Sequence, residues 1–407
     1  MRAPDRAAPS SLLPFLVLIP MNTTLHYLRS GAVISLLVLA AACQRGGDSP
    51  AAEATGAPAA ADPRTSGLFA ALTVPTNLDA EKVEMGARLY HDTNLSGDGT
   101  QSCSSCHNIA EGGDDGLVSS PGINGIPGPI NSPTTLNSHL NFVQFWDGRA
   151  ATLEEQAAGP VANPGEMGAV WTEVVAYVAA DPWYAEKFAA EYPDGVTQTN
   201  ITHAIAEFER SLVTPARFDA WLQGDDNAMT AAELEGLALF QSTGCTSCHN
   251  GAGLGGTTYQ RMGLIENYFE DRGNLTDADN GRFNVTQNEE DRHKFKVPIL
   301  RNITLTAPYF HDGSHTDLGE AVRTMARYQL GKTLNDGEVT SIVAFLGTLQ
   351  GETPTLNVPP LPASRFAAAP ADGSAVPAAG SGAPADGSAE ASAKPNDGSA
   401  AIPAVAP

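Results

Sequence analysis

Two pentapeptides of the form C-x-x-C-H, residues 103–107 and 245–249, constrain this chain more than any other feature. In this spacing two cysteine thiols capture the vinyl groups of a c-type haem, and the adjacent histidine becomes an axial ligand of the iron. A redox-active cysteine pair or half of a zinc site would be alternatives for a single copy. Two complete copies use four of the five cysteines, so the sequence predicts two covalently attached haems. The predicted attachment residues are Cys103, Cys106 and His107 for the first haem and Cys245, Cys248 and His249 for the second.

The length and charge of the chain limit its architecture and its partners. The 407 residues suffice for two domains of ordinary size, each with its own core. The formal net charge of -23 is spread along the chain and argues against a nucleic-acid partner. This acidity is compatible with a basic redox partner and equally with a role in solubility alone.

Residues 1–43 have the character of an export segment. An apolar run, Gly31 to Ala42, follows Arg29 and is shorter than a membrane-spanning helix. It ends at Cys43, the fifth cysteine, in a context that resembles a bacterial lipobox, although Ala40 stands where leucine is usual. We therefore expect a lipid anchor at Cys43, with ordinary signal cleavage nearby as the alternative. Export to the periplasm agrees with c-type haem attachment, which takes place outside the bacterial inner membrane.

Composition divides the remainder of the chain. Residues 44–66 are rich in Ala, Gly, Pro and Asp and indicate a flexible linker. Residues 353–407 repeat Asp-Gly-Ser in an Ala/Pro background and predict a disordered tail, because they bury too little apolar surface to fold alone. Between them we expect two domains, an N-terminal haem domain over 67–215 and a C-terminal one over 216–352.

A weak internal repeat supports this division. Residues 84–90 and 235–240 both place glycine and large apolar residues at helical spacing shortly before a haem motif. Strand patterns are few, so the predicted fold is mainly α, with two cytochrome c-like domains packed against each other. Further helices are predicted over 173–192, 200–222, 317–328 and 336–349.

Several ordered motifs accompany the haem sites. They comprise 145–149 (FWDGR), 152–156 (TLEEQ), 163–168 (NPGEMG), 296–302 (KVPILRN), 307–314 (APYFHDGS) and 325–331 (MARYQLG). Together they resemble the bacterial di-haem cytochrome c peroxidases, which are related to the MauG proteins. The resemblance covers nearly all of the expected folded body and implies reduction of hydrogen peroxide to water.

Reduction of peroxide requires an open axial position on one haem and a group that moves a proton between the two oxygens. The resemblance assigns the proton transfer to Glu166 and a hydrogen bond to peroxide to Gln156. From composition alone, an isolated glutamate would be a surface charge. The resemblance therefore makes the N-terminal haem the reactive one.

The second haem has a different expected role. The resemblance makes Met325 its second axial ligand, although a methionine in an amphipathic helix is more often a core residue. Thioether and imidazole together raise the potential and close the iron, which suits electron transfer. Trp146 matches the tryptophan that conducts electrons between the haems, and it could equally be a packing aromatic.

The resemblance also implies one calcium ion between the domains. Asn131, Thr306 and Pro308 match positions that supply an amide oxygen and backbone carbonyl oxygens, the hard donors that calcium prefers.

One position departs from the family pattern. In many relatives a histidine 16 residues after the first proximal histidine caps the resting iron, and reduction of the other haem expels it. Here that position is Ile123, which cannot ligate iron. We therefore expect the N-terminal haem to be open at rest. His139 is the nearest substitute ligand, although a lone loop histidine is more often solvated or packed.

The leading prediction is a cytochrome c peroxidase that receives electrons from a small cytochrome c or a copper protein. A MauG-like oxidase of aromatic residues in a partner protein is the first alternative. MauG proteins have tyrosine where Met325 stands, which disfavours that alternative. A non-catalytic di-haem electron carrier is the second, and the retention of Glu166 and Gln156 argues against it. The family resemblance also implies a possible homodimer.

Overall fold

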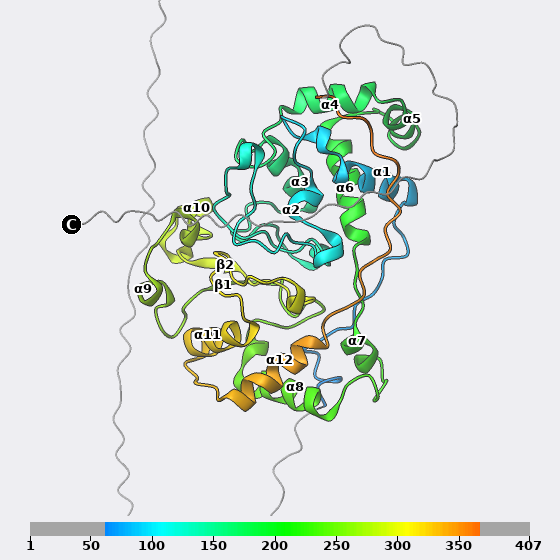
Figure 1. Ribbon diagram of the computed structural model, residues 1–407. Helices are drawn as coiled ribbons and strands as arrows, with labels where there is room; N and C mark the ends of the chain where they lie inside the picture. The colour runs from blue at the N-terminus through cyan, green and yellow to red at the C-terminus, as the bar shows by residue number, and fades with distance from the viewer. Residues whose placement is uncertain (1–61, 367–407) are drawn as a thin grey trace, which may run out of the picture. The chain divides into compact units, whose positions relative to one another are not determined.

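The computed structural model describes residues 62–366 of the chain (Figure 1). The expected export segment, Cys43 and most of the predicted linker lie outside the described residues. No helix among residues 62–366 is both long enough and apolar enough to cross a membrane.

The N-terminal half is built on a crossing of two helices, α1 (Ala80–His91) and α6 (Gln198–Ser211). The side chains of Asp79 and Thr197 cap their N-termini. The helices touch at Gly86, where a Cβ atom would lie 2.0 Å from the backbone oxygen of Ala204. Only glycine permits this close approach.

The C-terminal half contains the same kind of helix crossing at a glycine. Here α8 (Ala231–Thr243) crosses α12 (Asp336–Gly347), and a Cβ on Gly236 would lie 1.9 Å from the backbone oxygen of Ser341. The internal repeat seen in the sequence is thus a repeated helix crossing next to each haem motif. Each half has its own buried hydrophobic cluster, one around Leu89 and Phe208 and the other around Phe240 and Phe345.

The predicted helix over 173–192 is two helices, α4 (Trp171–Ala180) and α5 (Pro182–Glu191). Asp181 ends the first and caps the second, because its side chain accepts from the amides of Trp183 and Tyr184. Pro182 occupies the first turn of α5, where a missing N–H is harmless.

The predicted helix over 200–222 is also interrupted. Helix α6 ends at Ser211, and α7 (Arg217–Leu222) begins after a short extended segment that contains Pro215. Proline disfavours the helical conformation of the residue before it, so the helix is interrupted here. The apolar periodicity of the sequence continues across this interruption and does not reveal it.

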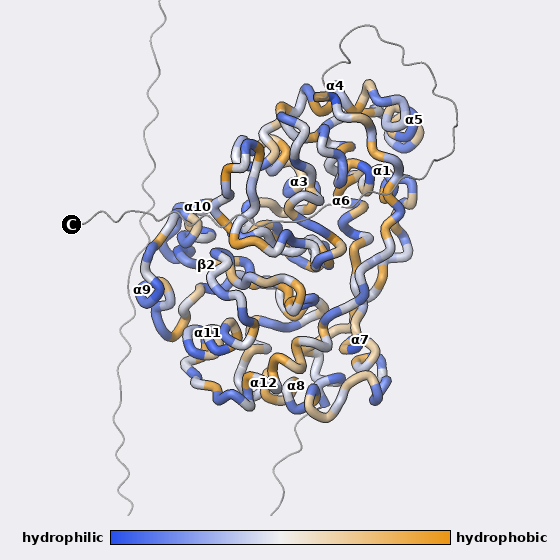
Figure 2. The backbone as a smooth tube through the Cα atoms, in the orientation of Figure 1, coloured by the Kyte–Doolittle hydropathy of each residue, from blue (hydrophilic) through white to orange (hydrophobic). Residues whose placement is uncertain are grey.

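Short elements complete the fold. Strands β1 (Tyr259–Arg261) and β2 (Lys294–Lys296) pair antiparallel, with Gln260 opposite Phe295. The remaining α-helices are α2 (Cys103–Cys106), α3 (Leu153–Ala162), α9 (Tyr268–Arg272), α10 (Phe283–Thr286) and α11 (Leu318–Leu330). Hydrophobic and hydrophilic residues alternate along the chain in Figure 2, as amphipathic elements require. The fold is mainly α-helical, as predicted.

Residues 353–366 differ from the disorder predicted for them. They run along the N-terminal half, where the backbone oxygen of Pro360 accepts from Nε of Arg88 at 2.9 Å. The amide of Arg365 donates to Oδ1 of Asn94 at 2.7 Å, and the ring of Phe366 lies against Gly99. This segment is ordered by the surface of the N-terminal half, a contribution that its own composition cannot indicate.

Candidate functional site

The first haem motif lies at a small cavity of about 70 Å³ in the N-terminal half. Helix α2 carries Cys103 and Cys106, and His107 follows directly. The Nδ1 atom of His107 lies 3.3 Å from the backbone oxygen of Gly113 and 3.2 Å from Oγ of Ser132. Burial lowers the pKa of His107, so the imidazole is neutral. Nδ1 faces the backbone oxygen of Gly113, so Nε2, which lies 3.4 Å from Oγ of Ser132, is the nitrogen that would bind a metal.

Two residues singled out in the sequence line the same cavity. Gln156 comes from α3, and Glu166 comes from the loop that follows this helix. The Nδ2 group of Asn163 donates to Oε1 of Glu166 at 2.8 Å, which leaves Oε2 for another partner. Burial raises the pKa of Glu166, partly offset by the charge of Arg149 and the bond from Asn163. The cavity thus combines a neutral imidazole, an amide and a carboxyl group that holds its proton more readily than usual.

A third polar residue of this cavity, Glu209 of α6, was missed in the sequence. It is 4% exposed, and its Oε2 atom has no hydrogen-bond partner among residues 62–366. Burial raises its pKa to about 8. A signal did exist, since Glu209 follows Ile201 and Ile205 at helical spacing and therefore falls on the apolar face of α6.

Ile123 lies beside this cavity without lining it. Its backbone N–H donates to the backbone oxygen of Glu166 at 2.8 Å, and its side chain packs against Gly168. His139 does not line the cavity either, and its Nδ1 has no partner among the described residues.

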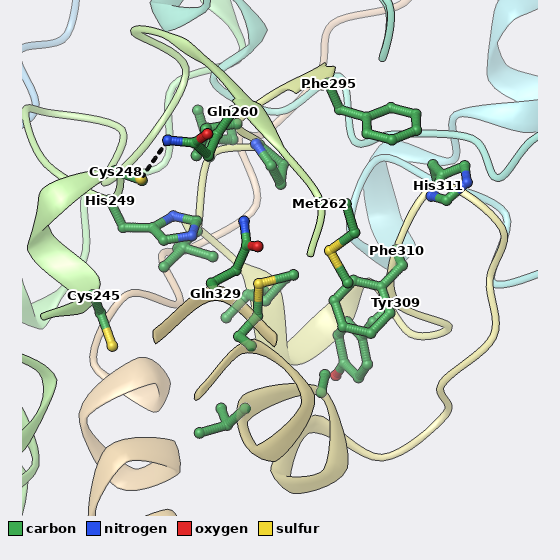
Figure 3. Close-up of a pocket in the computed structure, with 18 of the residues that line it drawn as sticks. Cys245, Cys248, His249, Gln260, Met262, Phe295, Tyr309, Phe310, His311 and Gln329 are labelled. Atoms are coloured by element: carbon green, nitrogen blue, oxygen red, sulfur yellow. Dashed lines mark hydrogen bonds between the residues drawn. The ribbon is translucent and has the colours of Figure 1, made fainter. Parts of the chain in front are cut away.

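The second haem motif lies at a larger cavity of about 440 Å³. Figure 3 shows Cys245, Cys248 and His249 on one side of it and Met262, Tyr309 and Phe310 on the other. The Nδ1 atom of His249 lies 3.0 Å from the backbone oxygen of Leu254, which again leaves Nε2 available. Burial lowers the pKa of His249.

Two methionines line the larger cavity. Met325 comes from α11, as the sequence predicts, and Met262 lies just after β1. Both offer a soft thioether sulfur, so this cavity holds an imidazole and two potential sulfur ligands. Met262 was not expected, because it belongs to none of the motifs read from the sequence.

Trp146 also lines the larger cavity, and it connects segments from the two halves of the chain. Its Nε1–H donates to the backbone oxygen of Asn131 at 2.9 Å, and its own backbone oxygen accepts from the amide of Lys296 at 2.8 Å. Burial lowers the pKa of Lys296 to about 8. Trp146 is thus held in place through both its ring and its backbone.

The residues expected at a calcium ion, Asn131, Thr306 and Pro308, line this same cavity. Nδ2 of Asn131 donates to the backbone oxygen of Leu117 at 2.9 Å, so Oδ1 faces away from that bond and can serve as a ligand. Nearby in the chain, Oδ1 of Asp114 is buried without a partner among residues 62–366, and burial raises the pKa of this carboxyl to about 7.

Asp279, His311 and Asp312 form a separate cluster of potential metal ligands. Arg272 donates to both carboxylates, and Nε2 of His311 lies 2.8 Å from Oδ1 of Asp279. Arg272 thus pairs with both carboxylates of this cluster, which together form an ion-pair network.

The residues around both motifs fit a haem. None of the four motif cysteines forms a disulfide, each proximal histidine is neutral, and the larger cavity is predominantly apolar. The smaller cavity has a much smaller volume than the larger one. There the agreement with a haem rests on the side chains that line it, namely the two cysteines and the histidine of the motif.

Known proteins that are similar to this chain also indicate two haem sites. The family described as "Di-haem cytochrome c peroxidase" matches residues 80–227. The chain is 50% identical to a cytochrome c551 peroxidase of Nitrosomonas europaea over 70% of its own length and 85% of that protein. It is 50% identical to a cytochrome c peroxidase of Escherichia coli, of which it spans 59%.

More distant relatives include MauG proteins and solved structures. A methylamine utilization protein MauG of Methylorubrum extorquens is 34% identical over 70% of this chain and 82% of that protein. The crystal structure of a MauG-like protein associated with microbial copper homeostasis is similar with a TM-score of 0.60 and 31% identity. That similarity covers 70% of this chain and 93% of the other.

Proposed function

Since this chain belongs to the di-haem cytochrome c peroxidases, oxidoreductases that act on peroxide, we propose a division of labour between its two haem sites. The site at His107 reduces hydrogen peroxide, and the site at His249 receives electrons. The supporting observation is that the carboxyl group of Glu166 and the amide of Gln156 share a cavity with His107, whereas no Asp or Glu of residues 62–366 lines the cavity that His249 shares with Met262 and Met325.

The reaction consumes two protons and two electrons for each hydrogen peroxide and yields two water molecules. When bound, each haem is held by its two cysteines as thioethers and supplies an iron centre for electron exchange. Oε2 of Glu166 takes the proton from the inner oxygen of peroxide and returns it to the outer oxygen, which leaves as water. The bond from Asn163 to Oε1 orients the carboxyl group. The side-chain amide of Gln156 holds peroxide through a hydrogen bond.

Electrons arrive from a small redox protein, a cytochrome c or a copper protein, at the second site. Met325 would hold the haem iron there together with His249, and its thioether sulfur would raise the potential of that site. Trp146 carries the electrons toward the first site. Its backbone and ring hydrogen bonds keep the indole in one orientation, which supports this role.

The N-terminal site is open at rest in this proposal. Isoleucine at position 123 offers no ligand, and His139 does not line the cavity at His107. The enzyme would then react with peroxide without prior reduction of its second site.

The c-type haem motifs support a proposal for the cellular location of the enzyme. We place it in the periplasm, tethered through a lipid at Cys43, with a homodimer as a possible assembly. One calcium ion on Asn131, Thr306 and Pro308 would hold the segment after 306 next to the loop at 131. Because Nδ2 of Asn131 donates to Leu117, Oδ1 of the same amide is left to act as a ligand, which supports this site.

Steady-state peroxide reduction with a reduced cytochrome c as electron donor tests the proposal. Replacement of Glu166 with glutamine should lower kcat by about 10²- to 10⁴-fold, the usual contribution of a general acid–base group. The haem absorbance should not change. Glu173→Gln, on the exposed side of α4, is the matched control and should behave as the wild type. Unchanged turnover in Glu166→Gln would rule out the assigned role.

The MauG-like oxidase remains a second candidate because the structure at 31% identity is a MauG-like protein. Identity to the curated peroxidases is higher, at 50%, than to MauG, at 34%. An oxidase would consume peroxide in the presence of a partner protein and would give little turnover with reduced cytochrome c.

A further inference from the structure

Glu209 is a buried acid that the proposed reaction does not yet use. Its side chain lines the cavity that also contains Glu166, Gln156 and His107. It is 4% exposed, and its Oε2 atom makes no hydrogen bond to residues 62–366. Burying a carboxyl group without partners is unfavourable, so a residue of this kind at a reactive cavity calls for an explanation.

The surroundings of Glu209 keep it uncharged. Burial raises its pKa to about 8, and the negative charge of Glu154 adds to this rise, while the charge of Arg210 opposes it. This rise favours the protonated form of the carboxyl group at neutral pH. Such a group can donate a proton into the cavity and be protonated again.

An ion pair whose charges act on Glu209 is partly exposed to solvent. Nη2 of Arg210, the next residue in α6, donates to Oε1 of Glu154 in α3 at 2.5 Å. The side chain of Glu154 is 26% exposed and that of Arg210 is 29% exposed. The ion pair is thus in contact with water and close enough to the buried carboxyl group for both of its charges to act on Glu209.

We propose that Glu209 is a proton-relay residue, which passes protons from the surface pair Glu154 and Arg210 to the cavity that contains Glu166. The inference rests on the proposed peroxide reduction. Glu166 only moves a proton from one peroxide oxygen to the other, so the two protons consumed in each turnover must enter from solvent. Glu209 gives up its proton toward the cavity and regains one from the side of Glu154, with no net change in the residue.

The first test is kinetic. Glu209→Gln keeps the shape and the hydrogen-bonding capacity of the side chain but cannot release a proton. We expect kcat for peroxide to fall about tenfold or more with KM unchanged, and the solvent deuterium isotope effect on kcat to increase, because proton delivery becomes limiting. Glu207→Gln is the matched control. Glu207 lies on the same helix and accepts a hydrogen bond from Arg210, but it does not line the cavity. It should retain wild-type kinetics.

The second test does not depend on turnover. The haem-loaded protein should show infrared absorption of protonated carboxyl groups at neutral pH, and the part of it that belongs to Glu209 should be lost in Glu209→Gln and kept in Glu207→Gln. A third variant, Glu209→Ala, should regain peroxide turnover as acetic acid is added, because a small acid can occupy the space of the missing side chain. If Glu209→Ala fails to load haem, the glutamine variant still decides the question.

The outcomes separate the two proposals. A wild-type protein that turns over peroxide, together with wild-type kcat and isotope effect in Glu209→Gln, would overturn the relay and leave the peroxidase function intact. A wild-type protein without peroxide turnover would overturn both. Identical carboxyl absorption in the wild type and in Glu209→Gln would show that Glu209 is ionised and would also overturn the relay.

Discussion

The backbone N–H of Ile123 donates a 2.8 Å hydrogen bond to the backbone oxygen of Glu166. This bond joins the loop after the first haem motif to the segment that carries the proposed acid–base residue. Gly122, the neighbour of Ile123, lines the cavity itself. Position 123 is thus adjacent to the cavity, and we expect the chemistry of its side chain to determine whether the proposed reactive site is open.

Replacement of Ile123 with histidine should close the N-terminal site. An imidazole at this position can ligate the ferric iron, so the resting haem should become low-spin. Turnover by the oxidised enzyme should then show a lag until the second site is reduced. Optical and electron paramagnetic resonance spectra of the resting protein measure the spin state.

The control for this change is Ile126→His, in the same loop. Ile126 is 56% exposed, so its replacement should leave the resting spectrum unchanged. A wild-type protein whose two ferric haems are both low-spin at rest would contradict the expectation of an open site.

Replacement of Met325 with leucine should lower the potential of the second haem. Loss of a thioether ligand removes its stabilisation of ferrous iron, and axial ligands tune haem potentials over a range of about 0.8 V. We expect a fall on the order of 0.1 V or more, measured by spectroelectrochemical titration. Met262→Leu is the matched control, because both methionines line the same cavity. If only Met262→Leu lowers the potential, Met262 is the ligand.

Glu209 should give the stability of the protein a pH dependence of definite sign. Burial raises its pKa to about 8 from the ordinary 4.5, so the folded protein binds this proton more tightly than the unfolded chain does. The resulting stability is fully present below about pH 4.5 and is lost as the pH rises to about 8. Within this window the free energy of unfolding should fall by up to about 1.4 kcal/mol per pH unit relative to Glu209→Gln.

Urea unfolding of both proteins at several pH values between 5 and 8 measures this difference. Glu207→Gln should follow the wild type at every pH. A wild-type curve parallel to that of Glu209→Gln would mean that the pKa of Glu209 is the same in the folded and unfolded states.

Local signals in the sequence predicted many of the residues that the structure brings together at the two cavities, but only part of the geometry. The C-x-x-C-H motifs identify attachment residues without any knowledge of the fold, and glycines 86 and 236 mark the two helix crossings. The partners of those glycines, Ala204 and Ser341, lie more than 100 residues away. Such contacts depend on tertiary packing, which periodicity within one segment cannot specify.

Glu209 illustrates why part of the site was missed. Its position on the apolar face of α6 is visible in the sequence, but its burial depends on α3 and on the loop of Glu166. The break at Asp181 was missed for a different reason. A capping aspartate followed by proline interrupts a helix without interrupting its apolar pattern.

The ordered part of the C-terminal segment leads to a test of how the halves of the chain are stabilised. Truncation after Glu352 removes the bonds from Arg88 to Pro360 and from Arg365 to Asn94, together with the packing of Phe366 on Gly99. At about 1 kcal/mol for each hydrogen bond, the free energy of unfolding of the N-terminal half should fall by about 1 to 3 kcal/mol. Truncation after Phe366 keeps all of these contacts and should match the full chain in urea unfolding followed through the haem absorbance. Equal stability of the two truncated proteins would show that residues 353–366 do not stabilise the N-terminal half.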